Sequence, residues 1–123
     1  MPDSTLKQIK PWVKAFSAEI PHKYKHGEIV CIGGLITKIV DLTHIYKDFE
    51  RFIYVHIDDD VGECVVLIPF EIYNEIQKEY EIKEGEVVIV EGKVLDKKTD
   101  QGKPEVVCWN ICPLSSKITK KGG

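Results

Sequence analysis

Residues 51–68 read RFIYVHIDDDVGECVVLI, and this stretch decides the fold. Side chains of a strand point alternately to opposite faces, so one face of the first half carries only branched apolar residues. Those residues are Ile53, Val55 and Ile57. Residues 60–62 then supply a tight turn with a glycine. The stretch therefore predicts two neighbouring strands, at 51–59 and 63–68, with one buried and one exposed face.

The flanking sequence predicts three further strands and one helix. The strand at 28–41 is apolar on both faces, and Gly33-Gly34 permits a sharp bend within it. Pro69 opens a helix of about a dozen residues with an apolar stripe. Strands at 86–96 and 105–112 follow. Five strands with a helix between the third and fourth predict an all-β, five-stranded Greek-key barrel, the OB-fold.

The barrel is predicted to occupy residues 27–113, with a disordered tail at 114–123. Apolar residues recur at helical spacing in the N-terminal extension, 1–26, and Pro11 suits the first turn of a helix over 11–19. Two interpretations of this extension stay open. It either plugs or packs against the barrel, or it is a docking segment for a larger partner.

Charge is distributed unevenly along the 123 residues. Residues 28–112 hold nine lysines and arginines against eighteen aspartates and glutamates. Strong non-specific nucleic-acid binders are normally basic, so any such binding must depend on local patches. The chain has no apolar run long enough to span a membrane and no secretory pattern at its start. We therefore expect no membrane partner and a cytoplasmic location.

No residue pattern predicts catalysis, a metal site or a cofactor. The four cysteines lie in or at the ends of apolar strands and are expected to be buried, reduced thiols. Cys108 and Cys112 are expected on one strand face, yet too far apart to share a metal ion. Residues 58–60, three aspartates, fit a turn better than a Ca²⁺ loop. We therefore expect a protein that is not an enzyme.

The outward face of the strand at 51–59 carries the candidate binding residues. Phe52 and Tyr54 remain on that face, beside Arg51 and His56. Exposed rings stack on unpaired bases, with about 1–3 kcal/mol per base. The alternative is that the N-terminal helix or the loop at 42–50 covers both rings.

The loops at 42–50 and 97–104 are expected to flank this face, because the corresponding loops border the binding groove in the OB-fold. The complete predicted nucleic-acid site comprises Lys38, Tyr46, Lys47, Arg51, Phe52, Tyr54, His56, Lys97, Lys98 and Lys103. Trp109 is expected in the core or at its rim rather than as a stacking platform.

Residues 28–94 resemble the OB domains of bacterial DNA polymerase III alpha subunits and the anticodon-binding domains of class II aminoacyl-tRNA synthetases. The matching stretches are GEIVCIGGLI at 27–36, YVHIDD at 54–59, VVLIP at 65–69 and IKEGEVVIVEGKV at 82–94. The resemblance implies that Tyr54 faces a bound strand. The loop at 42–50 departs from the family, because it is bulkier and mixed in charge. These 123 residues include no polymerase or synthetase catalytic domain, so the chain is expected either to stand alone or to be an excised module.

The leading hypothesis is therefore a single-stranded nucleic-acid-binding module of replication or repair, with DNA favoured over RNA. The alternative is a protein-interaction or scaffolding module within a replication or repair assembly. Oligosaccharide binding is a third reading, and the oligomeric state is not predicted.

Overall fold

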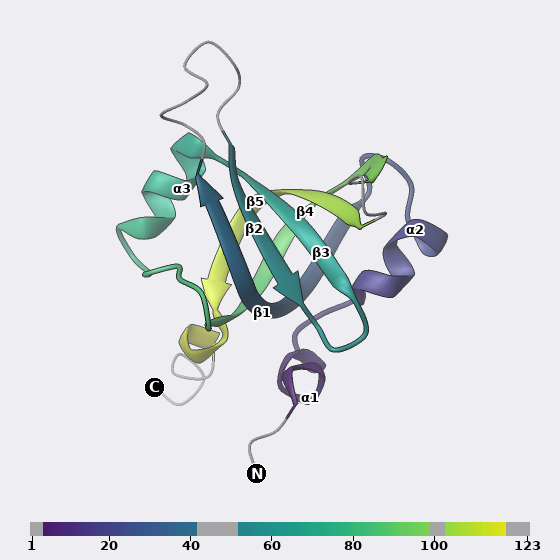
Figure 1. Ribbon diagram of the computed structural model, residues 1–123, viewed down its shortest axis with the longest axis horizontal. Helices are drawn as coiled ribbons and strands as arrows, with labels where there is room; N and C mark the ends of the chain where they lie inside the picture. The colour runs from purple at the N-terminus through teal and green to yellow at the C-terminus, as the bar shows by residue number, and fades with distance from the viewer. Residues whose placement is uncertain (1–3, 42–51, 99–102, 118–123) are drawn as a thin grey trace.

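A computed structural model describes residues 4–41, 52–98 and 103–117, with only the backbone of 96–98 (Figure 1). The strands are β1 (Ile29–Asp41), β2 (Phe52–Asp58), β3 (Glu63–Pro69), β4 (Val87–Lys98) and β5 (Pro104–Pro113). They form a closed barrel in the order β1-β2-β3-β5-β4. The β3–β5 pair is parallel and the other pairs are antiparallel. The predicted OB-fold is confirmed.

Short helical segments accompany the barrel, among them α1 (Thr5–Ile9), the 3₁₀ turn η1 (Ser17–Glu19), α2 (Ile20–Lys23) and α3 (Phe70–Gln77). Helix α3 follows Pro69 as predicted but has 8 residues rather than about a dozen. Within the described segments, no helix has the length and apolarity needed to cross a membrane.

The helix predicted over residues 11–19 is wrong. Pro11 has no N–H to donate, so α1 ends before it rather than starting there. The backbone N–H groups of Lys14 and Ala15 then donate to the carbonyl of Cys31, at 2.9 and 3.3 Å. Hydrogen bonding to β1 therefore holds this segment extended, and the apolar spacing is divided between shorter helices.

β1 closes the barrel because it bends between two partners. Its first half pairs with β4 and its second half with β2, and Leu35 belongs to both pairings. A Cβ atom on Gly33 would lie 2.8 Å from the carbonyl oxygen of Val88, and one on Gly34 would lie 2.9 Å from that of Asp58. Only glycine allows the three strands to approach this closely, at the position where the sequence predicted a bend.

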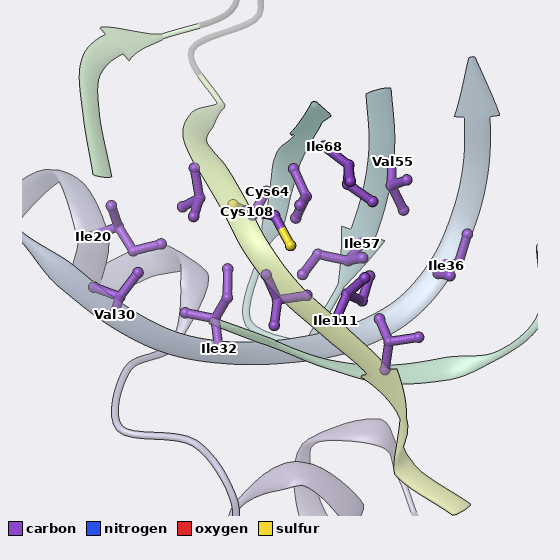
Figure 2. Packing of buried hydrophobic residues seen from close by; sticks show 14 of the residues in the cluster. Ile20, Val30, Ile32, Ile36, Val55, Ile57, Cys64, Ile68, Cys108 and Ile111 are labelled. Carbon is purple, nitrogen blue, oxygen red and sulfur yellow. The ribbon is translucent and has the colours of Figure 1, made fainter. Parts of the chain in front are cut away.

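The interior of the barrel is filled mainly by branched aliphatic side chains (Figure 2). Ile53, Val55 and Ile57 are at most 1% exposed, which confirms the predicted inward face of β2. Ala15 and Ile20 of the N-terminal segment belong to the same core cluster, and Ile20 lies beside Val30 in Figure 2. The extension therefore packs into the barrel, in agreement with the first of its two interpretations.

A second apolar cluster lies outside the barrel wall. Ile9 packs there with Ile89, Cys112 and Leu114, and Trp12 lies against the group. Leu114 is only 5% exposed and begins a helical turn over residues 114–117, which the sequence had assigned to the tail. Residues 118–123 lie outside the described residues.

A buried carboxylate fastens the N-terminal segment to the β2–β3 turn. Asp59, 2% exposed, accepts hydrogen bonds from the backbone N–H of Ser17 at 2.7 Å and from its hydroxyl at 2.8 Å. The backbone N–H groups of Val61 and Gly62 donate to the same carboxylate at 3.0 and 2.9 Å. The acidic cluster is therefore turn chemistry, as predicted, and additionally a docking point for the extension.

Replacing Asp59 by asparagine should strongly destabilise the fold. The amide nitrogen of asparagine donates hydrogen bonds, whereas the carboxylate oxygen that it replaces accepts them from N–H groups. Hydrogen bonds to a buried charge are worth about 1.5–3 kcal/mol each. We expect a loss of about 3 kcal/mol in the free energy of unfolding, measured by urea denaturation.

Asp60→Asn is the matched control. Asp60 is exposed, has a positive φ of 73° that asparagine tolerates, and accepts one hydrogen bond from the N–H of Leu6. Its replacement should cost less than about 1 kcal/mol. Equal losses in the two variants would show that Asp59 is not the anchor.

Candidate nucleic-acid interface

Four side chains of β2 point out of the barrel and remain partly exposed: Phe52, Tyr54, His56 and Asp58. The N-terminal segment packs against β1, β4, β5 and the β2–β3 turn, and η1 also contacts β3. In Figure 1 no helix passes in front of the middle of β2. The two rings therefore retain accessible surface on the outer face formed by β1, β2 and β3, which we call the β2 face.

A β-bulge in β1 brings a lysine onto the β2 face. The register shifts between Ile36 and Lys38, so that Lys38 lies opposite His56 and Thr37 has no partner across the strands. Thr37 and Lys38 are consequently both exposed. The hydroxyl of Thr37 donates to the carbonyl of His56 at 3.3 Å, which ties the bulge to β2.

Two lysines, Lys103 and Lys38, lie close enough to His56 to affect its pKa. Its pKa is lowered from the ordinary value of 6.5, first by partial burial and then by repulsion from Lys103 and Lys38. Glu63, which forms an ion pair with Lys103, partly opposes this shift. The neutral imidazole is therefore favoured, and it can donate or accept a hydrogen bond.

The charges beside His56 nearly balance. Lys38 and Lys103 are cationic, whereas Glu63 and Glu105 are anionic. Glu105, 8% exposed, pairs with Val65 of β3, which in turn pairs with His56. Beside Tyr54, the register places only apolar neighbours, Val40 and Leu67. This part of the β2 face therefore suits stacking with a base, accompanied by few phosphate contacts, better than contact with many phosphates of a backbone.

The structure brings together five of the ten predicted site residues: Lys38, Phe52, Tyr54, His56 and Lys103. Tyr46, Lys47 and Arg51 lie outside the described residues, and so does the loop proposed as an alternative cover for the rings. Lys97 and Lys98 extend β4, and their side chains are not described.

Sequence reasoning missed Thr37, Glu63 and Glu105 as members of this surface. The bulge at Thr37 depends on pairing with β2, which one strand's periodicity does not reveal. The two glutamates reach His56 and Lys103 only through the pairing of β3 with β2 and β5. The sequence offered one signal for these residues: the predicted turn at 60–62 places Glu63 next to β2.

Three of the four cysteines, Cys64, Cys108 and Cys112, are buried as expected, whereas Cys31 is only half-buried. All four are free, and burial raises the pKa of the Cys108 thiol to about 12. Cys108 lies inside the barrel but Cys112 packs outside it, because a bulge intervenes in β5, so their predicted shared face is wrong. In the part of the chain that the structure describes, no three His, Cys, Asp or Glu side chains are grouped to hold a metal ion.

Solved structures share this fold at low sequence identity. Asparaginyl-tRNA synthetase from Pyrococcus horikoshii aligns at 19% identity with a TM-score of 0.61, over 81% of this chain and 22% of the synthetase. OBody AM3L09 bound to hen egg-white lysozyme aligns at 22% identity with a TM-score of 0.60, over 85% and 96% of the two chains. OBody AM1L10, bound to the same lysozyme, aligns at 19% identity with a TM-score of 0.57, over 84% and 94%.

These similarities establish the OB-type barrel. The chain spans about one-fifth of the synthetase it matches. No family model matches the chain, and no curated protein matches it. The fold is therefore shared, whereas the ligand has to be inferred from this chain's own residues.

The position of His56 gives a direct test of the β2 face. We expect an NMR titration to give a pKa below 6.5, and Lys38→Met to raise it by removing a repelling charge. Because the unfolded chain then binds the proton first, stability should fall as pH drops through 6.5.

Lys7→Met is the control, because Lys7 is an exposed residue of α1 and not among the charges that act on His56. A His56 pKa at or above 6.5, or one that responds equally to both lysines, would contradict the arrangement.

Proposed function

We propose that this protein binds single-stranded nucleic acid across the β2 face, without catalysing a reaction. The observation that carries the proposal is the pair of partly exposed rings, Phe52 and Tyr54, on the outward side of β2. Bases stack on such rings regardless of their identity, so sequence preference should be weak.

Lys38 supports the proposal because the bulge directs it to the same face as Tyr54. One ammonium group can neutralise one phosphate of the bound strand. Lys103 is already paired with Glu63, so it contributes less. The main stabilisation would then come from stacking, and the salt dependence of binding would be shallow.

We propose DNA as the ligand and replication or repair as the setting, on the resemblance of residues 28–94 to polymerase OB domains. RNA is the alternative, favoured by the structural likeness to a tRNA synthetase. The β2 face has no feature that selects a 2′-hydroxyl among its described residues, so both polymers belong in the test.

Binding of labelled oligothymidine and oligouridine, followed by fluorescence anisotropy, tests the proposal. Tyr54→Ala should weaken binding by about 1–3 kcal/mol at every salt concentration, because it removes a stacking surface. Lys38→Ala should reduce the slope of log affinity against log salt by about 0.7, which is the share of one phosphate contact.

Two variants serve as controls. Tyr54→Phe keeps the ring and should keep the affinity, and Lys7→Ala removes a lysine from α1 and should leave the slope unchanged. Wild-type affinity in Tyr54→Ala would end the proposal, and tighter binding of oligouridine would assign the surface to RNA.

A further inference from the structure

A second surface lies between α3 and β5, which pack against each other. An open groove of about 620 Å³ runs there, and its apolar lining comes from Ile72, Ile76 and Trp109. We call it the α3–β5 groove. Its volume falls within the range of ligand-binding sites, large enough to hold several side chains of a partner.

A bulge in β5 exposes Trp109 in this groove. Gly92 pairs with Cys108 and Glu91 with Asn110, so Trp109 is the extra residue between two paired positions. The amide of Asn110 donates to the carboxylate of Glu91 at 3.3 Å and holds the bulge against β4. Trp109 therefore stays 39% exposed instead of entering the core, as bulged residues near binding sites often do.

Helix α3 and the turn that follows it line the other side of the groove with carboxylates. Glu71, Glu75 and Glu79 are spaced at four-residue intervals, which places them on one side of the helical path. Lys78 forms an ion pair with Glu75 at 3.0 Å. Among the described residues, neither Glu71 nor Glu79 has a cationic partner.

This arrangement costs stability in the free protein. Like charges four residues apart in a helix repel each other. A large exposed ring beside apolar side chains is also unfavourable in water. A bound cation would relieve the repulsion and cover the ring at once.

We propose that the α3–β5 groove binds a basic segment of a protein partner. An arginine or lysine of that segment lies against the Trp109 ring and between the carboxylates, and an adjacent apolar side chain contacts Ile72 and Ile76. Guanidinium groups stack on tryptophan faces and pair with carboxylates at the same time. The groove repels nucleic acid, so this surface is separate from the β2 face and does not depend on the proposed function.

A labelled peptide in which arginine and leucine alternate tests the proposal by fluorescence anisotropy. It should bind, and the matching peptide with glutamate in place of arginine should not. Trp109→Ala should weaken binding about tenfold, since a cation over an indole ring is worth about 1–2 kcal/mol. The double variant Glu71→Gln, Glu79→Gln should weaken it comparably while preserving the surface and its shape.

Glu84→Gln is the matched control, because Glu84 is exposed but does not line the groove. Equal weakening by Glu84→Gln, or full binding by Trp109→Ala, would reduce the effect to general attraction between opposite charges and overturn the proposal. Self-association that the groove variants abolish, measured by sedimentation, would overturn it in favour of a second copy of this chain. Oligothymidine binding by the same variants should be unchanged, so the two proposals fail separately.

Discussion

The bend of β1 at Gly33 and Gly34 is the constraint on which the barrel depends. Without it one strand could not pair with β4 along its first half and with β2 along its second. The two halves then serve different purposes. The first receives the N-terminal segment at Cys31, and the second carries Lys38 to the face where the β2 rings emerge. Gly33 and Gly34 thus determine the positions of both the surface that the N-terminal segment packs against and the β2 face.

The strands, the glycine bend and the two faces of β2 were predictable because alternation and glycine content are local properties of the sequence. The two bulges were not, since each depends on the register with a neighbouring strand. The one at Thr37 turns Lys38 outward, and the one at Trp109 exposes that ring and separates the faces of Cys108 and Cys112. The roles of the N-terminal residues were hidden for the same reason, because hydrogen bonds to Cys31 and Asp59 overrode helical periodicity.

The separation of charge over the surface matters more than the net charge of −3. Lys38 and Lys103 lie on the β2 face beside Glu63 and Glu105, whereas Glu71 and Glu79 line the groove beside α3. Both surfaces include aromatic rings that the barrel leaves partly exposed. The β2 face combines its rings with nearly balanced charges, whereas the α3–β5 groove combines Trp109 with carboxylates. The two proposed ligands would therefore contact separate parts of the molecule.

The burial of Ile20 and Ala15 changes where the folding unit begins. A fragment excised at residue 27 would keep every strand, yet it would lose two side chains of the central cluster and leave the Asp59 carboxylate facing a vacated space. Water would then reach the open end of the barrel and hydrate aliphatic side chains that are buried in the intact chain. Residues 4–26 therefore close one end of the barrel, and a partner that pulled them away would have to supply a replacement.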